Sequence, residues 1–141
     1  MATQKAFKGA EMTVDIRVVR ANDFIRTTPR GDLNLEASCK VIQDLSTVLK
    51  YTNHFHVLID VRDTTVNLSM SELFFLGNAV ASSPRLVQSK TAVLGNIGQP
   101  EKDQFFELVA RNRGANLKAF TSFEEAVNWL VFDETGPGRQ Q

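Results

Sequence analysis

A strand end and a helix start in the middle of the chain hold the side chains whose types and spacing could support chemistry. Asp60 and Arg62 follow the apolar run Val57–Ile59, and Ser69 and Ser71 stand a few residues further on. Such a run is typical of a central strand that is covered on both faces. Ligands of open α/β sheets bind where such strands end and the next helix begins. Asp60, Arg62 and Ser71 are therefore candidate contacts for an anion or for a carboxylate of a partner.

Each of these side chains also has a structural interpretation. Arg62 could form a local ion pair with Asp60 or Asp63, which contributes little to stability if it is exposed. Ser69 and Glu72 have the three-residue spacing of a capping box, just before an apolar run. The spacing therefore predicts that Ser69 caps a helix over about residues 70–82, whether or not it has a regulatory role.

The helix that Ser69 would cap begins with an unusual apolar run. Leu73, Phe74, Phe75 and Leu76 are consecutive, and one helical stripe cannot bury four consecutive bulky side chains. Phe74 and Phe75 are therefore candidate interface residues, in a dimer contact or against a lipid-like ligand. The alternative is a wide stripe that faces the core.

No catalytic residue, cofactor or metal site is predicted. His54 and His56 share one face of a strand, but a third ligand is not evident in the sequence. Cys39 falls between core positions of a helix, where a cysteine behaves as a small buried hydrophobe. The segment from Gly95 to Gly98 lacks the third glycine of a dinucleotide-binding loop. We expect a protein that is not an enzyme.

Composition limits the class of protein. The chain has 141 residues, of which 43% are hydrophobic and 23% charged, with 16 basic and 16 acidic residues. These values are typical of one globular domain, and they argue against a general nucleic-acid binder, which would be basic. The single cysteine, Cys39, cannot form a disulfide within the chain, and no run resembles a signal peptide or a membrane span. We expect a cytoplasmic protein that does not span a membrane.

The periodicity predicts an α/β fold with the order β-β-α-β-α-β-α-β-α. Alternation over Met12–Val18 and the β-formers of Phe24–Thr28 predict an opening hairpin. Strands that alternate with helices then predict a mixed, mostly parallel sheet of about five strands with about four helices. We expect a flexible N-terminus over residues 1–10, one domain over residues 11–132 and a flexible tail over residues 133–141.

Four stretches resemble the STAS domain family, and its SpoIIAA-like group most of all. They are the turn Arg30–Asn34, the strand Val57–Val61, the strand Lys90–Gly95 and the closing segment Ala119–Leu130, which contains Phe-Glu-Glu-Ala-Val-Asn-Trp-Leu. The closing segment is the most specific of the four. Together they span about residues 12–132, so the resemblance covers most of the chain.

This resemblance implies a module that works by binding, in protein–protein signalling. In anti-sigma factor antagonists, a serine of an Asp-Ser-Ser-Gly motif at the start of the second helix is phosphorylated. Ser69 is the position here that matches this serine, although the Asp and Gly of the motif are missing. The first hypothesis is thus a regulatory protein-interaction module, with a protein partner or a second copy in a homodimer.

The alternative hypothesis is a carrier of a small apolar or lipid-like ligand. The phenylalanine-rich helices, with Phe74, Phe75, Phe105 and Phe106, could line a pocket against the sheet. A cavity between the second and third predicted helices would favour this hypothesis, and a packed core there would contradict it.

Overall fold

A mixed sheet runs through the whole of the computed structural model, which describes residues 2–8, 12–19, 24–51 and 56–132. Within these residues eight strands pair in the order β6-β4-β2-β3-β5-β7-β8, and β1 pairs with β2. The strands are β1 (Ala2–Lys8), β2 (Met12–Val19), β3 (Phe24–Thr27), β4 (Arg30–Leu33), β5 (His56–Asp60), β6 (Thr64–Val66), β7 (Lys90–Leu94) and β8 (Asn116–Phe120). The helices are α1 (Leu35–Lys50), α2 (Met70–Ala81), α3 (Pro84–Val87), α4 (Pro100–Asn112) and α5 (Phe123–Val131).

The predicted order of elements is confirmed. Strands β2 and β3 form the expected antiparallel hairpin, and β3, β5, β7 and β8 are parallel neighbours joined through helices. The five predicted strands and four predicted helices correspond to β2, β3, β5, β7, β8 and to α1, α2, α4, α5. The result is the mixed α/β sheet that the periodicity predicts.

The structure adds short elements to this plan. Ala2–Lys8, which the sequence predicts to be flexible, forms strand β1 along β2 in an antiparallel register. Arg30–Leu33, predicted as a turn, forms strand β4, which continues the register of β3 along β2 and pairs with β6. Pro84 begins the short helix α3, because proline suits a first helical position. The predicted tail over residues 133–141 lies outside the described residues.

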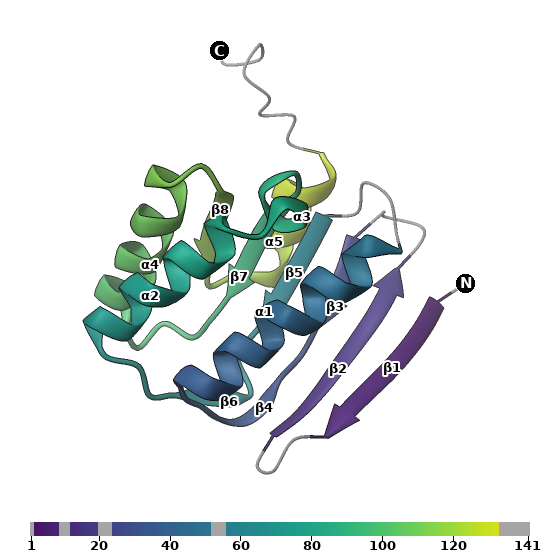
Figure 1. Ribbon diagram of the computed structural model, residues 1–141, viewed down its shortest axis with the longest axis horizontal. Helices are drawn as coiled ribbons and strands as arrows, with labels where there is room; N and C mark the ends of the chain where they lie inside the picture. Colours follow the sequence, from purple (N-terminus) through teal and green to yellow (C-terminus); the bar gives the residue numbers. More distant parts are fainter. Residues whose placement is uncertain (1, 9–11, 20–23, 52–55, 133–141) are drawn as a thin grey trace.

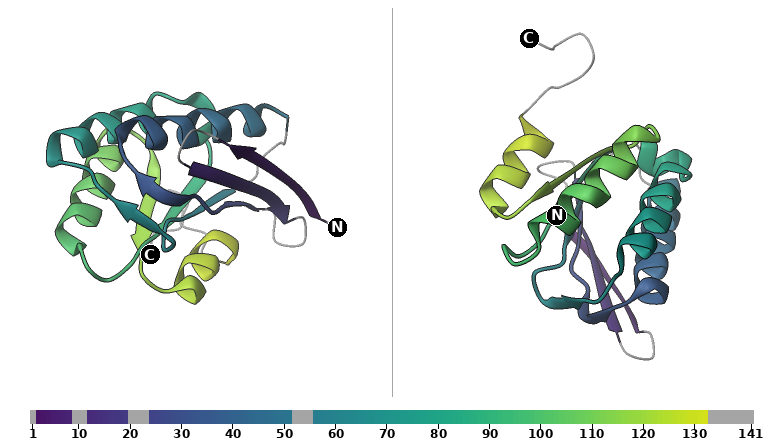
Figure 2. Two further views of the ribbon diagram at one scale, coloured as in Figure 1. Left: turned by 90° about the horizontal axis from the view of Figure 1, so that it is seen from below. Right: turned by 90° about the vertical axis from the view of Figure 1, so that its left-hand side faces the viewer.

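Two helical layers cover the sheet. Helices α1, α2 and α4 lie over one face and α5 lies over the other, as Figure 1 and the edge-on views of Figure 2 show. Side chains of β5 alternate accordingly: Val57 and Ile59 pack toward α1, and Leu58 packs toward Trp129 of α5. Asp60, the next residue in this alternation, therefore belongs to the α5 face.

Close packing holds α2 against α4. A Cβ atom at Gly77 would lie 2.6 Å from Cγ1 of Val109, so the two helices approach more closely there than a larger residue would allow. The spacing of Phe105, Leu108 and Val109 predicts the core stripe of α4, but Leu108 is 55% exposed, and the buried residues of the helix are Val109 and Ala110. The absence of a side chain at Gly77 therefore allows α4 to pack closely against α2.

Capping residues mark the helix ends. The sequence has two candidate N-caps before α1, Asp32 and Asn34, and Asn34 is the one whose side chain accepts the Ala37 backbone N–H. Gly114, with φ 107°, follows the end of α4.

The start of α5 differs by one residue from the capping box that the spacing of Thr121 and Glu124 predicts. Ser122 is the N-cap, and its Oγ accepts the backbone N–H of Glu125.

Candidate functional site

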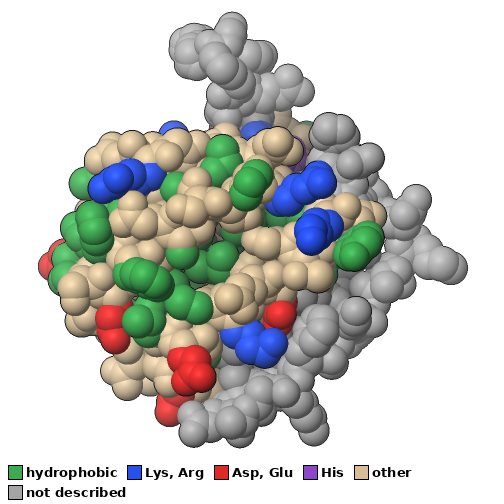
Figure 3. Space-filling model, in the orientation of Figure 1, with side chains coloured by type: hydrophobic (Ala, Val, Ile, Leu, Met, Phe, Trp, Pro, Cys, Tyr) green, Lys and Arg blue, Asp and Glu red, His purple; other side chains and the backbone are tan. Residues whose placement is uncertain are grey.

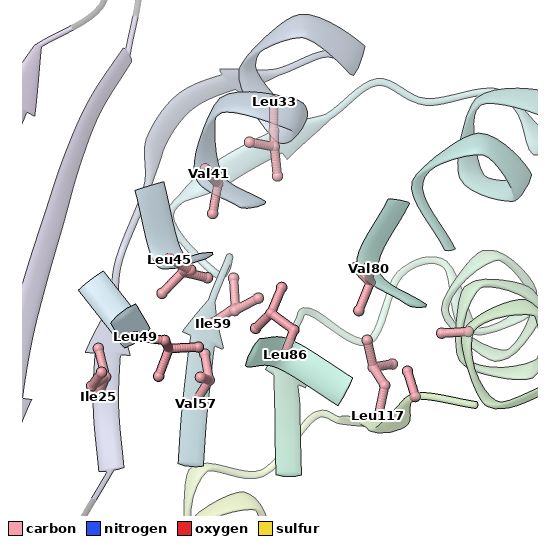
Figure 4. Packing of buried hydrophobic residues seen from close by; sticks show 12 residues of the cluster. Ile25, Leu33, Val41, Leu45, Leu49, Val57, Ile59, Val80, Leu86 and Leu117 are labelled. Atoms are coloured by element: carbon pink, nitrogen blue, oxygen red, sulfur yellow. The ribbon is translucent and has the colours of Figure 1, made fainter. Parts of the chain in front are cut away.

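A cavity of about 300 Å³ lies between the sheet and helices α1, α2 and α4. Its walls are mostly apolar, and they include Leu33, Val41, Ile59, Leu76, Val80 and Phe106. Figure 4 draws part of this lining, and in it Leu33 and Val41 lie across from Val80. Figure 3 shows hydrophobic side chains gathered in the middle of this helical face. The helices therefore leave a space that apolar side chains surround but do not fill.

Two polar groups in the cavity wall lack hydrogen-bond partners within the described residues. Ser38 of α1 is 7% exposed, and its Oγ atom is buried without a partner. Asp103 of α4 is half-buried, and burial raises the pKa of its carboxyl above the ordinary value of 3.8. The raised pKa reflects desolvation of the charged form, with no partner to offset it. Lys102 also lines the cavity, and its Nζ donates a hydrogen bond to the Leu68 carbonyl over 2.8 Å.

A second, polar pocket of about 440 Å³ lies around the end of β5. It is lined by Arg26, Thr28, Arg30, Asp60, Arg62, Asp63 and Asn96. Asn96, in the loop after β7, lines both pockets, and its Nδ2 donates to the Arg62 carbonyl over 3.1 Å. The two pockets therefore meet at the edge of the sheet where β5 and β7 end.

Asp60, at 2% exposed, is the buried centre of the polar pocket. Its Oδ1 accepts hydrogen bonds from the backbone N–H and the Nε–H of Arg62, over 3.1 and 2.9 Å. Its Oδ2 accepts from an Nη of Arg62 and from an Nη of Arg26, both over 2.9 Å. Burial by itself raises the pKa of Asp60, but the hydrogen bonds from both arginines outweigh it, so the pKa lies below 3.8.

The aromatic ring of Phe123 lies under both arginines. The guanidinium carbons of Arg26 and Arg62 are 5.4 and 5.8 Å from the ring centroid, within the range of cation–π contacts. The spacing of Phe123, Val127 and Leu130 predicts a core stripe on α5, but Phe123 is 39% exposed. Its role in the structure is to support the arginine pair, while Ala126, Trp129 and Leu130 are the buried residues of α5.

The structure separates the predicted site residues into three places. Asp60 and Arg62 are directly paired, which is the local ion pair considered from the sequence, and Arg26 joins it from β3. Ser71 is exposed in the first turn of α2 and does not line the polar pocket. The sequence therefore predicted the strand end correctly but grouped Ser71 with it, whereas Ser71 Oγ lies 3.2 Å from Ser69 Oγ.

Ser69 is the N-cap of α2, as predicted. Its Oγ accepts the backbone N–H of Glu72 over 3.2 Å, and the Glu72 carboxylate accepts the backbone N–H of Ser69 over 2.9 Å. This reciprocal pair is a complete capping box. The hydroxyl is exposed, so a regulatory role for Ser69 stays a prediction beside its capping role.

Phe74 and Phe75 are exposed, by 45% and 54%. The guanidinium of Arg113, at the end of α4, lies 5.8 Å from the centroid of the Phe74 ring. The core-facing side of α2 is formed by Leu73, Leu76 and Val80 instead. Phe74 and Phe75 are therefore not part of a wide stripe that faces the core, and their role in an interface stays a prediction.

The remaining candidates have structural roles. His56 Nδ1 accepts the backbone N–H of Lys90 over 3.0 Å, and His54 lies outside the described residues. Cys39 is half-buried against the cluster of Leu68, Leu73 and Leu76, and burial raises the pKa of its thiol. Across the described residues, three or more metal-ligating side chains do not gather anywhere. None of the described helices is long and apolar enough to span a membrane.

Sequence reasoning missed Ser38, Asp103 and the arginines that complete the polar pocket. Arg26 and Arg30 lie on strands far from Asp60 in the sequence, and only the pairing of β3 with β5 brings Arg26 to it. Ser38 offered one signal, since it is a polar residue one turn before Val41 and Ile42 on the apolar side of α1. Asp103 was interpreted only as an acidic residue at a helix start.

Comparisons with known proteins concern the fold alone. No protein-family model and no curated protein matches the chain. Among solved structures, the chain is similar to an uncharacterised protein of the DUF3478 family with a SpoIIAA-like fold, from Shewanella loihica PV-4. The identity is 15%, the TM-score is 0.49, and the match covers 92% of this chain and 93% of that one. A likeness of this degree carries no conclusion about the fold family or the function of this chain.

Proposed function

We propose that this protein works by binding a small, largely apolar molecule in the cavity between α1, α2, α4 and the sheet, and that it does so without catalysis. The cavity itself carries the proposal. Its volume of about 300 Å³ and its mostly apolar walls suit the lower end of the range of ligand sites, about 300–1,000 Å³. A packed core at this place would have argued for a module that binds only at its surface.

The position of the cavity also supports this proposal. It lies beneath α2 and α4, against the sheet, where the carrier hypothesis expects a pocket, but of the four phenylalanines that this hypothesis names only Phe106 lines it. Each methylene group that a ligand buries there contributes about 0.8 kcal/mol of transfer free energy. Affinity should therefore rise with chain length until the cavity is full.

A pair of matched substitutions tests whether the cavity binds ligands. Val41 lines the cavity, whereas Val57 is fully buried in packed core and does not line it. Val41→Phe should abolish binding of hexan-1-ol, measured by calorimetry, and keep the stability of the fold, because the ring fills open space. Val57→Phe should instead lower the free energy of unfolding by about 1–3 kcal/mol through overpacking.

The outcomes of this test are distinct. If wild-type protein binds none of a series of apolar probes, the proposed function is wrong. If Val41→Phe destabilises the fold as much as Val57→Phe does, the space is not available to a side chain, and the proposal loses its supporting observation.

A second candidate function is regulatory self-association through the outer face of α2. The exposure of Phe74 and Phe75 favours it, since adjacent exposed aromatic residues on one helix are a feature of contact surfaces. The proposed partner is a second copy of this chain, in line with a formal net charge of zero, which gives little repulsion between copies.

Light scattering tests this candidate. Phe74→Asp and Phe75→Asp should convert a dimer into a folded monomer. Phe132→Asp is the matched control, because Phe132 is 72% exposed just after α5, on the opposite helical layer, and it should leave the dimer intact. A wild-type protein that is monomeric at high concentration would contradict self-association and leave the cavity proposal unaffected.

A further inference from the structure

The hydroxyl of Ser38 differs from other hydroxyls in or just after the helices of this protein. Thr47 of α1 donates to the backbone carbonyl four residues earlier over 3.0 Å, and Ser82 and Ser89, just beyond α2 and α3, do the same over 2.8 and 3.2 Å. The Asn34 carbonyl accepts the backbone N–H of Ser38, but the Oγ of Ser38 has no hydrogen-bond partner among the described residues. The helix therefore leaves a hydroxyl available where it normally satisfies one.

This hydroxyl lies in the wall of the apolar cavity. Ser38 is only 7% exposed, and it lines the cavity next to Val41 and Ile42 of the same helix. A polar group that is buried without a partner is unfavourable, and alanine would be a better helix former at this position. A ligand atom that forms a hydrogen bond with Ser38 Oγ would remove this cost.

The charged groups of the cavity restrict the kind of polar atom. The carboxylate of Asp103 lines the same cavity without a hydrogen-bond or ion-pair partner among the described residues, next to Gly95 at the end of β7. Lys102 also lines it, and its Nζ uses one of three N–H donors on the Leu68 carbonyl and keeps its positive charge. A ligand carboxylate would bring a second negative charge into the cavity that Asp103 lines, in partly desolvated surroundings where like charges repel strongly.

We propose that the ligand of this cavity is an apolar molecule with one uncharged oxygen function, a hydroxyl or a carbonyl, that pairs with Ser38, and that Asp103 discriminates against ligands that end in a carboxylate. The inference rests on the proposed function and names the class of ligand for the same cavity. It distinguishes alcohols, ketones and esters from free fatty acids of the same length.

Three six-carbon probes with the same chain and different ends test the inference: hexan-1-ol, 1-chlorohexane and hexanoate at neutral pH. Calorimetry gives each affinity, and the backbone amide shifts of cavity residues in NMR spectra locate each probe. Wild-type protein should bind hexan-1-ol about tenfold more tightly than either other probe, the difference expected for one hydrogen bond or one unfavourable charge.

Two variants assign these preferences to residues. Ser38→Ala should weaken hexan-1-ol about fivefold to tenfold and leave 1-chlorohexane unchanged, because only the alcohol loses a hydrogen bond. Asp103→Asn should strengthen hexanoate about tenfold and leave hexan-1-ol nearly unchanged. Ser46→Ala is the matched control on α1, since Ser46 pairs with Ser83 and does not line the cavity. It should change none of the three affinities.

Failure of this inference can be told from failure of the proposed function. If hexan-1-ol and 1-chlorohexane bind equally, in wild type and in Ser38→Ala alike, the cavity binds apolar molecules and Ser38 does not select them. If hexanoate binds wild-type protein as tightly as hexan-1-ol does, Asp103 does not discriminate against carboxylates. If no probe shifts cavity amides in any variant, both the proposed function and this inference are wrong. The melting temperature of Ser38→Ala, expected to equal or exceed that of wild type, excludes misfolding as the cause of lost binding.

Discussion

The two faces of the sheet shift the pKa of a carboxyl group in opposite directions. Asp60, on the α5 face, accepts four hydrogen bonds from Arg26 and Arg62, and its pKa is lowered although it is almost fully buried. Asp103, on the face of α1, α2 and α4, is only half-buried, yet its pKa is raised because no partner offsets its desolvation. The number of partners, more than the depth of burial, decides the direction of each shift.

This difference suggests different roles for the two places: the Asp60 cluster is structural, and the cavity with Ser38 and Asp103 is a candidate binding site. On the α5 face the Asp60 carboxylate is paired within the chain, although the Nε of Arg26 has no hydrogen-bond partner among the described residues. Phe123 supports both arginines by stacking against them. The opposite face contains an apolar cavity with the unpaired groups of Ser38 and Asp103. Unsatisfied polar groups at a cavity are unfavourable in the isolated protein, and they are the groups that a bound molecule could satisfy.

The largest loss of stability should come from removing the charge of Asp60, which pairs with Arg26 and Arg62. Asp60→Asn leaves Arg26 and Arg62 without a counter-charge, and we expect the free energy of unfolding to fall by about 2–4 kcal/mol. The value lies below that of a fully buried pair, because the arginine side chains are 32% and 38% exposed and solvent screens them. Urea denaturation at neutral pH measures the loss.

Asp63→Asn is the control for this comparison. Asp63 lines the same pocket and is exposed, and no ion pair to it is found within the described residues. Its replacement should change stability by less than about 0.5 kcal/mol. Equal effects of the two substitutions would show that general charge, and not the hydrogen-bonded cluster, stabilises this edge of the sheet.

A smaller effect should come from separating the helices that enclose the cavity. In Gly77→Ala the new methyl group would meet the Val109 side chain at 2.6 Å, so α2 or α4 must shift. Overpacking costs about 1–3 kcal/mol and the better helix propensity of alanine returns about 1 kcal/mol, so we expect a net loss of about 1 kcal/mol. Thermal unfolding measures this loss, and affinity for hexan-1-ol should change in the same variant.

Gly98→Ala tests whether the close contact is the cause. Gly98 also lines the cavity, but a Cβ atom there would have no neighbour within 4 Å. Its stability should match that of wild type. A stable Gly77→Ala variant with unchanged affinity would mean that α4 adjusts without affecting the cavity.

The sequence predicted the elements well and the site only in part. Apolar runs, Pro100 and the Ser69–Glu72 spacing act locally, so they predicted the strands and helix starts. Local patterns could not place Arg26 beside Asp60, because that contact depends on which strands pair. They could not show the cavity either, because its walls come from strands and helices that are far apart in the sequence. The Phe74–Phe75 run was informative because it violates the helical periodicity of a buried stripe.

The smallest effect should come from Asp103→Asn, and its pH dependence should be opposite to that of Asp60. The pKa of Asp103 is raised in the folded state, so its contribution to stability is present below the ordinary pKa of 3.8 and is lost as the pH rises through the folded-state pKa. The asparagine side chain of the variant does not titrate, so the variant should gain stability relative to wild type over this range. The gain should be a fraction of the Asp60 effect, because Asp103 is half-exposed and the start of α4 favours its charge.

The pKa of Asp60 is shifted in the opposite direction, so its contribution to stability depends on pH in the opposite way. Its lowered pKa means that its contribution is present above 3.8 and is lost as the pH falls through the folded-state pKa. Unfolding curves of wild type, Asp60→Asn and Asp103→Asn between about pH 2 and pH 7 should therefore diverge in opposite directions as the pH rises. If Asp103→Asn became less stable than wild type above pH 3.8, Asp103 would have a stabilising partner in solution. The contrast between the two faces would then not hold, and Asp103 could no longer discriminate against a ligand carboxylate through an unpaired charge.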